Sequence, residues 1–224
     1  MHTVGGMRVA IAGGHGQVAR QLSRALSARG DVPVALVRQL GHVDDVVADG
    51  AEAVVLDLER ANARDVAEAI AGADAVVFAA GAGPGSGIDR KDSVDRAAAG
   101  LLADGAEQAG VRRYVLVSSM GAGAPPPPGT DEVFAAYLVA KRAAEQDLRA
   151  RELAWTILRP GALTDDPASG TVALEPSVAR GAVPRADVAA VLVALLHEPR
   201  SARLVLELVS GDVPVTAAVA AALA

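Results

Sequence analysis

The chain has 224 residues, of which 51% are hydrophobic but only 2% aromatic, with a formal net charge of −6 and no cysteine. This length suits one sizeable domain with a core of Val, Leu, Ile and Ala, and the missing thiols exclude disulfides and thiolate chemistry. An acidic balance without a basic block argues against nucleic acid as a partner. No stretch is long and apolar enough for a signal peptide or a membrane span, so we expect a cytoplasmic protein.

Apolar runs alternate with amphipathic stretches along the first half of the chain. We expect strands over Arg8–Ala12, Val32–Val37, Ala53–Leu56, Asp74–Ala80 and Arg113–Val117. Helices are expected over Gln17–Arg29, from the cap Asn62 through Ala71, and over Lys91–Ala109. Continuous Val-rich strands of this kind are buried on both faces, which predicts a doubly wound parallel α/β sheet in three layers.

The second half keeps this alternation less strictly. After a stiff connector at Pro125–Pro128 we expect a helix over Asp131–Arg151 and a strand over Trp155–Leu158. The remaining expected elements are a short strand over Thr171–Leu174, a helix over Ala186–Leu196, a strand over Leu204–Val209 and a last helix in the tail. We therefore predict a single domain over residues 1–224, in which residues 161–224 form a small substrate-side extension.

The first strand runs into a glycine-rich loop and then into a helix. Gly14-x-Gly16-x-x-Ala19 matches the Rossmann dinucleotide fingerprint, and Gly13-x-x-Gly16-x-x-Ala19 is an overlapping spacing in the same loop. Gly16 would let the backbone approach a pyrophosphate, and the free N–H groups of the helix N-terminus would bind its oxygens. The alternative is a tight glycine turn without a ligand, in which His15 only packs in the loop or hydrogen-bonds to a phosphate.

The end of the second strand bears on the choice of nucleotide. NAD binders place a carboxylate there for the ribose hydroxyls, whereas NADP binders place an arginine. Here Arg38 occupies that point and no acidic residue follows until Asp44, which favours NADP(H) over NAD(H). The alternative for Arg38 is a solvated side chain at a strand end. Asp57 would lie at the mouth of the third strand near the adenine, or serve only as a turn or capping aspartate.

Candidate catalytic residues follow the fifth strand. Ser118 and Ser119 lie at its carboxyl end, and the next helix carries Tyr137 and Lys141, whose spacing of four places them on one helix face. A phenol with an ordinary pKa near ~10 needs a neighbouring ammonium to exchange protons at neutral pH. A serine hydroxyl would hold the same substrate oxygen. The alternative is an aromatic residue that packs on the helix beside a solvated lysine.

The strand–GGxGxxA–helix unit, the VSS strand end, the YxxxK helix and the LRPG of residues 158–161 resemble the short-chain dehydrogenase/reductase superfamily. More narrowly, the chain resembles its atypical NAD(P)H-binding branch, which includes NmrA-like proteins, biliverdin reductase B-like flavin reductases and small bacterial proteins named sugar epimerases. The resemblance covers nearly the whole chain and implies a Rossmann-like fold. Two departures are the AAGAG that ends the fourth strand in place of NAG, and the 18 positions between Ser119 and Tyr137.

The resemblance also implies roles for individual residues. The pyrophosphate would meet Gly13, Gly16 and Gln17, and a 2′-phosphate would meet Arg38. The adenosine side would be lined by Ala79, Ala80 and Gly81, and the nicotinamide side by Pro160 and Gly161. The catalytic set would be Ser119, Tyr137 and Lys141, with Lys141 also reaching the nicotinamide ribose. Further expected cofactor contacts are Gly14, His15, Val18, Asp57, Leu58, Val117 and Ser118.

These features predict an NADPH-dependent oxidoreductase that reduces a small carbonyl, quinone or flavin-like substrate. One alternative is a cofactor-binding redox sensor or regulatory protein without turnover, as among the NmrA-like relatives. Another is a nucleotide-sugar epimerase. It is the weaker alternative, because residues 161–224 are few for a region that must wrap around a nucleotide sugar. We expect a monomer or a homodimer with a small-molecule substrate, and neither nucleic acid nor membrane as a partner.

The remaining polar residues give weaker signals. The four histidines, His2, His15, His42 and His197, are scattered, so no metal site is expected. Asp165 and Asp166 would cap a loop or touch a substrate. The polar loop Gly81–Gly87 would lie at the active edge and could close over a cofactor. Behind it, Lys91 could contact a substrate, although the simpler expectation for Arg90 and Lys91 is a solvated helix start.

Overall fold

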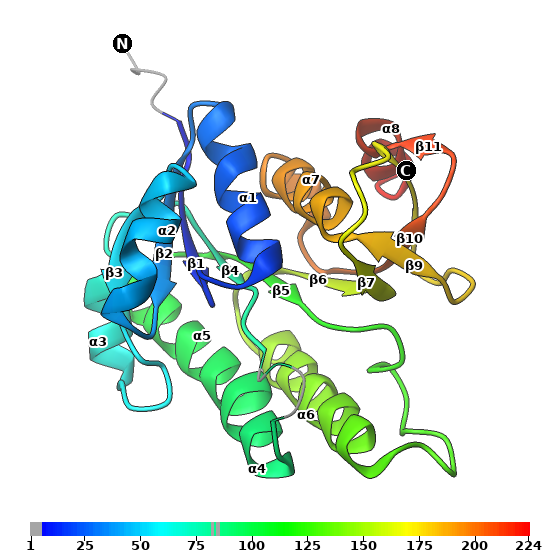
Figure 1. Ribbon diagram of the computed structural model, residues 1–224, viewed down its shortest axis with the longest axis horizontal. Coiled ribbons are helices and arrows are strands. Elements are labelled where there is room, and N and C mark those ends of the chain that lie inside the picture. Colours follow the sequence, from blue (N-terminus) through cyan, green and yellow to red (C-terminus); the bar gives the residue numbers. More distant parts are fainter. Residues whose placement is uncertain (1–5, 82, 84–85) are drawn as a thin grey trace.

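The computed structural model describes residues 6–81, 83 and 86–224. His2 and part of the loop 81–87 lie outside the described residues. The described part of the chain forms a nine-stranded sheet with helices on both faces and a separate two-stranded sheet (Figure 1). The strands are β1 (Arg8–Ala12), β2 (Val32–Val37), β3 (Glu52–Val55), β4 (Ala75–Phe78), β5 (Arg113–Val117), β6 (Ala154–Pro160), β7 (Ala162–Thr164), β8 (Thr171–Glu175), β9 (Ala182–Pro184), β10 (Leu204–Ser210) and β11 (Val213–Pro214). The helices are α1 (Gln17–Ala28), α2 (Val43–Ala48), α3 (Ala63–Ala69), α4 (Ile88–Arg90), α5 (Ala98–Ala109), α6 (Glu132–Arg149), α7 (Arg185–Leu196) and α8 (Val215–Ala221).

The order of the strands confirms the predicted fold. The sheet runs β11-β8-β10-β6-β5-β4-β1-β2-β3, and all neighbours from β3 to β10 pair in parallel, whereas β8 runs antiparallel to β10. The order 3-2-1-4-5-6 is that of a doubly wound Rossmann sheet. The direction in which successive strands are added to the sheet reverses between β1 and β4, although the strands stay parallel. Ligands of such sheets bind in the crevice beyond the carboxyl ends of the strands at that point.

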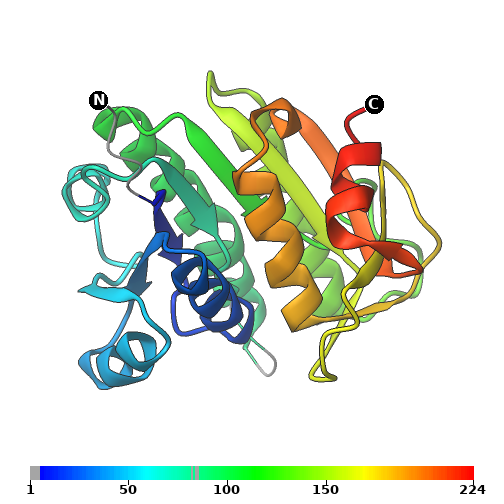
Figure 2. The same cartoon turned by 90° about the horizontal axis from the view of Figure 1, so that it is seen from above.

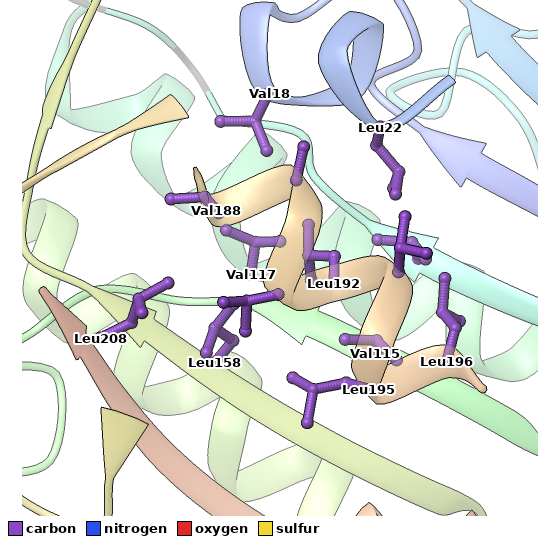
Figure 3. Packing of buried hydrophobic residues seen from close by; sticks show 14 of the residues in the cluster. Val18, Leu22, Val115, Val117, Leu158, Val188, Leu192, Leu195, Leu196 and Leu208 are labelled. Carbon is purple, nitrogen blue, oxygen red and sulfur yellow. The ribbon is translucent and has the colours of Figure 1, made fainter. Parts of the chain in front are cut away.

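Strand residues alternate between two buried layers because side chains of a strand point to opposite faces. Val9 and Ile11 of β1 belong to the buried cluster that contains residues of α1, α7 and α8, whereas Ala10 and Ala12 belong to the cluster that contains residues of α3, α5 and α6. Figure 2 shows α1 and α7 side by side over one face. Figure 3 shows side chains of this buried layer, among them Leu22 of α1, Leu192 of α7 and the branched side chains Val117 of β5 and Leu158 of β6. This buried aliphatic core holds the loops of the carboxyl edge in place.

The expected strands and helices are largely confirmed, with ends that shift by one or two residues. Asn62 caps α3 as predicted, and Asp65 completes a capping box with it. The prediction missed the 3-10 turn at Leu40–His42 and α2, because only Val46 of α2 is buried and so short a helix shows no periodic apolar face. It also missed β7, β9 and β11, which have only two or three residues each.

The single helix expected over Lys91–Ala109 is wrong at its start. A π-helical segment, Lys91–Ala97, lies between α4 and α5. A π turn holds more residues than an α turn, so it changes which side chains face the protein. Lys91, Val94 and Asp95 of this segment are all buried. No helix among the described residues is both long and apolar enough to cross a membrane.

Candidate functional site

The loop after β1 is a glycine cradle whose members have different reasons to be glycine. Gly13 has a φ of +76°, and a Cβ atom on it would lie 2.6 Å from the Ala80 Cα atom. A Cβ atom on Gly14 would lie 2.6 Å from the Ala35 Cβ atom. Both glycines therefore allow β1 to pass close to its neighbours in the sheet. Gly16 is different, because a Cβ atom there would meet only backbone oxygens, with the Gly13 oxygen nearest at 3.1 Å.

The start of α1 fits an anionic ligand. Gly16 is the N-cap residue, no side chain caps the helix, and its first turn holds no acidic residue. The first N–H groups of a helix have no partner within the helix, and the helix dipole makes this end positive. Gly16, Gln17 and Val18 line a cavity at this end. The residues present thus fit a phosphate group without a competing side chain.

Two cavities adjoin at the carboxyl edge of the sheet, where they share Gly16, Ala79, Ala80 and Gly81. The first, of about 320 Å³, lies beyond β1, β2 and β3. Its lining includes the predicted residues Gly13, His15, Arg38, Asp57 and Leu58. The second, of about 500 Å³, lies between α1, β5 and α6. Its lining includes the predicted residues Gln17, Val18, Val117, Ser118, Tyr137 and Lys141.

Two guanidinium groups converge on one carboxylate in the first cavity. The Arg38 Nη1 atom lies 3.5 Å from the Glu59 Oε2 atom, and Arg90 Nη2 donates to the same oxygen at 2.9 Å. A hydrogen bond from Ser93, with Arg90 and Arg38 beside it, outweighs burial and lowers the pKa of Glu59. Sequence reasoning missed Glu59 and treated Arg90 as solvated. Nothing in the sequence links the two residues, since they are 31 positions apart.

A pair of histidines forms part of the same wall. The rings of His15 and His42 are stacked with centroids 3.8 Å apart, and both residues line the first cavity. His15 Nε2 lies 2.7 Å from an oxygen of Asp45 on α2. Burial, with His15 and Arg38 nearby, lowers the pKa of His42. Asp57 also acts as a turn aspartate, because its Oδ1 atom accepts a hydrogen bond from the backbone N–H of Glu59.

Tyr137 and Lys141 share one face of α6 in the second cavity, but the lysine is not solvated. The Lys141 side chain is 4% exposed, and its Nζ atom lies 3.2 Å from the Oδ1 atom of the fully buried Asp95. Nζ also donates to the carbonyl oxygens of Val117 at 3.1 Å and Ala80 at 3.4 Å. It lies 5.7 Å from the centre of the Tyr137 ring. The ammonium is therefore neutralised by Asp95, a residue that the sequence analysis did not select.

Of the two serines after β5, Ser118 lines the second cavity and Ser119 does not. Ser118 Oγ donates to Glu145 at 2.5 Å, and Arg159 donates to both oxygens of that carboxylate. Ser119 Oγ donates to the Met120 carbonyl oxygen at 3.3 Å. The structure thus places a different serine at the cavity from the one expected to be catalytic.

Three further predicted residues, Gly14, Pro160 and Gly161, lie outside the lining of both cavities. Gly161 has a packing role, because a Cβ atom there would lie 2.2 Å from the Gly181 carbonyl oxygen. Pro160 ends β6 and is buried. Leu163 and Arg185 reach the second cavity from this half of the chain instead. Asp165 pairs with Arg185 at 2.8 Å. The described residues contain no cluster of side chains that could hold a metal ion.

The expectation of a solvated helix start is wrong for Lys91. The residue is 8% exposed and lines the second cavity, where Nζ donates to the Gly83 carbonyl oxygen at 2.9 Å. Nζ also lies 5.5 Å from the centre of the Tyr137 ring. The cause is the π-helical segment, which begins at Lys91 and turns its side chain inward.

Comparisons with known proteins agree with this geometry. A family model described as NAD(P)H-binding matches residues 13–199. A protein of Bacillus subtilis named uncharacterized sugar epimerase YhfK is 34% identical over 213 residues, which cover 95% of this chain and 98% of that protein. A solved structure of a putative NAD-dependent epimerase/dehydratase from Bacillus halodurans is 36% identical with a TM-score of 0.87, over 94% of this chain and 97% of that one.

Another similar structure is that of the anaerobilin reductase ChuY from Escherichia coli O157:H7. It is 26% identical with a TM-score of 0.78, over 92% of this chain and 98% of that one. The resemblance to atypical short-chain dehydrogenases is thereby confirmed, and with it the general class of Rossmann-fold, oxidoreductase-like proteins. Because the matched range covers most of the chain, begins in the glycine cradle and contains all residues that line the two cavities, the chain belongs to the NAD(P)H-binding family.

Proposed function

We propose that the protein binds NADP(H) and reduces a small carbonyl, quinone or flavin-like substrate with NADPH. The observation that carries the choice of nucleotide is the convergence of Arg38 and Arg90 on the first cavity. A 2′-phosphate is a dianion that guanidinium groups bind through two parallel hydrogen bonds. The end of β2, where NAD binders place a carboxylate, is occupied by Arg38.

The second cavity supports the reductase chemistry. Bound NADPH supplies a hydride to the substrate carbon. The Tyr137 hydroxyl would give a proton to the substrate oxygen, since Tyr137 lines the cavity beside the N-terminus of α1. Lys141 holds α6 through Asp95 and two backbone carbonyls, and this fixes the position of the tyrosine. The Ser118 hydroxyl donates its hydrogen bond to Glu145, so its oxygen would accept a hydrogen bond from the ligand.

Titration of the protein with NADPH and with NADH tests the nucleotide. We expect the wild type to bind NADPH at least tenfold more tightly than NADH. Arg38→Ala should weaken NADPH binding roughly ten- to hundredfold, the effect of losing hydrogen bonds to a charged group, and leave NADH binding unchanged. Arg64→Ala is the matched control, since Arg64 is an exposed arginine on α3 that lines neither cavity. Equal affinities of the wild type for the two nucleotides would contradict the proposal.

A second candidate is a cofactor-binding regulator without turnover. The observation that favours it is the pairing of Lys141 with Asp95, because this ammonium is not free to activate the phenol. NADPH oxidation with a panel of quinones, flavins and aldehydes separates the two functions. Tight NADPH binding without oxidation by any of them favours the regulator. Epimerisation consumes no NADPH overall, so a separate assay for the conversion of UDP-glucose into its epimer tests the activity that the name of the Bacillus subtilis relative contains.

A further inference from the structure

The chain uses lysine in only one region. It has 21 basic residues, of which only Lys91 and Lys141 are lysines, and both line the second cavity. Arginine serves at every other basic position, including the exposed ion pairs. A lysine ammonium is a compact charge with three donors, whereas a guanidinium is a broad planar fork. The second cavity is therefore the one place where this sequence uses compact cations.

The two lysines differ in how their charge is balanced. Lys141 is paired with Asp95. Lys91 is 8% exposed, yet among the described residues no carboxylate forms an ion pair with it, and its Nζ atom donates only to the Gly83 carbonyl oxygen. A buried ammonium is costly unless an anion and further hydrogen bonds compensate it. Lys91 thus has a positive charge and two N–H groups available to a ligand.

The other charged residues that line the cavity do not compensate the ammonium of Lys91. Asp131 lines the cavity, but it is exposed and its Oδ1 atom accepts the hydrogen bond that caps α6. Arg185 lines the cavity from the start of α7, but it is paired with the exposed Asp165 at 2.8 Å. Since Asp95 pairs with Lys141 and Asp165 pairs with Arg185, Lys91 is the cation of this lining with which no carboxylate of the described residues forms an ion pair. An anionic ligand fits this balance.

Part of the remaining lining is apolar and open to solvent. Val133, Phe134 and Leu163 line the cavity and are 39%, 45% and 38% exposed. The Phe134 ring stacks with the Tyr137 ring at a centroid distance of 5.8 Å. Exposed apolar side chains beside a buried cation suit a ligand with an apolar or aromatic body and one anionic end.

We propose that Lys91 binds a carboxylate group of the substrate, so that the substrate class is a carbonyl compound with an apolar or aromatic body and a carboxylate. The body lies against Phe134 and its neighbours, and the carboxylate lies beside Tyr137, where the Lys91 Nζ atom is 5.5 Å from the ring centre. This rests on the proposed function in placing the substrate in the second cavity.

Calorimetric titration with two probes of the same shape and different charge tests the assignment. The probes are 4-carboxybenzaldehyde and 4-formylbenzamide, each added to the full chain with saturating NADP⁺ and again without cofactor. We expect the wild type to bind the carboxylate at least tenfold more tightly than the amide. Lys91→Met should abolish this difference while NADPH affinity stays within twofold. Arg149→Met, which removes an exposed charge from the same helix as Tyr137, should change neither.

The outcomes separate this inference from the proposed function. Equal binding of the two probes by the wild type, with NADPH binding intact, overturns the role of Lys91 and needs no variant. A Lys91→Met protein that keeps the preference for the carboxylate overturns it as well. If the variant instead loses NADPH affinity, Lys91 binds the phosphates of the cofactor and the inference is wrong. A wild type that binds no NADPH overturns the proposed function, and the comparison without cofactor then still decides whether Lys91 selects carboxylates.

Discussion

Lys141 and Asp95 form a buried ion pair across the second cavity, with the Nζ and Oδ1 atoms 3.2 Å apart and side chains that are 4% and 0% exposed. The aspartate comes from the π-helical segment and the lysine from α6, and these two elements pack against each other. The pair therefore joins the element that carries Lys91 to the helix that carries Tyr137. Because both residues line the second cavity, the pair holds two of its walls at a set distance from each other.

Removal of one partner of this pair should be strongly destabilising. Asp95→Ala leaves an ammonium buried without its carboxylate, and we expect a loss of about 3–5 kcal/mol in the free energy of unfolding. The double variant Asp95→Leu with Lys141→Met removes both charges and should recover most of that loss. Urea denaturation measures both. Asp92→Asn, in the same segment but exposed, is the control and should cost less than about 1 kcal/mol. A similarly small cost for Asp95→Ala would refute the structural importance of the pair.

Two glycines of the cradle should respond in opposite ways to alanine. Gly14→Ala would push a Cβ atom against Ala35 in the sheet, so we expect a loss of stability of about 1–3 kcal/mol. Gly16 has a φ of −65° and a ψ of 151°, which alanine adopts readily, and it lines both cavities, where a Cβ atom would lie 3.1 Å from the Gly13 carbonyl oxygen. Gly16→Ala should therefore fold normally and lose NADPH binding by tenfold or more. Thermal unfolding and NADPH titration measure the two effects, and unchanged affinity of Gly16→Ala would place the pyrophosphate elsewhere.

The fold could be predicted from sequence because its signals are local. The strands Arg8–Ala12, Val32–Val37 and Arg113–Val117 have the predicted bounds, since each is a continuous apolar run that ends at a turn residue or polar side chain. The glycine cradle follows the first of them directly. Tyr137 and Lys141 were paired by the helical period alone.

Contacts between distant segments were not predictable in the same way. Glu59 meets Arg90 only because the chain after β3 passes the end of α4, and Asp95 meets Lys141 only because the π-helical segment packs against α6. The inward direction of Lys91 depends on that same segment, where an α-helical period would misplace every following side chain. Ser119 was expected to be catalytic, but Ser118 lines the second cavity and donates a hydrogen bond to Glu145, a residue 27 positions away.

The two tyrosines of the chain give a matched test of the reductase mechanism. Tyr137→Phe removes the candidate proton donor and should lower turnover roughly 10²- to 10⁴-fold while NADPH affinity stays within twofold. Tyr114→Phe removes a hydroxyl that donates to the Ala99 carbonyl oxygen at 3.0 Å in the core. It should cost about 1 kcal/mol of stability and leave turnover intact. Steady-state NADPH oxidation measures the difference, and full turnover by Tyr137→Phe would exclude the tyrosine from the reaction.

Asp49 should make part of the stability depend on pH. Burial alone would raise the pKa of this carboxyl, but hydrogen bonds from Arg20 at 2.5 Å and Arg24 at 2.6 Å outweigh it and lower the pKa. A carboxyl with a lowered folded-state pKa stabilises the fold above its ordinary pKa, and this contribution is lost as the pH falls through the folded-state value. Asp49→Asn should therefore be about 1–3 kcal/mol less stable than the wild type at pH 7.

The difference in the free energy of unfolding between the wild type and Asp49→Asn should shrink as the pH falls below about 4, where the carboxyl of Asp49 takes up its proton. Urea denaturation at a series of pH values measures it. Asp44→Asn is the control, because Asp44 is exposed in the first turn of α2, the helix whose C-cap residue is Asp49. This variant should show no such trend. A constant difference down to the acid unfolding of both proteins would contradict the role of the two arginines.

Glu59 gives a test of the first cavity that strengthens binding instead of removing it. Its carboxylate forms ion pairs with Arg38 and Arg90, and its negative charge would repel a 2′-phosphate that approaches these two arginines. Glu59→Gln should tighten NADPH binding roughly two- to fivefold, the effect of a partly exposed ion pair worth about 0.5–1 kcal/mol. NADH has no such phosphate, so its affinity should stay the same or fall. Titrations at low ionic strength measure both, and weaker NADPH binding would show that Glu59 serves to orient the two arginines.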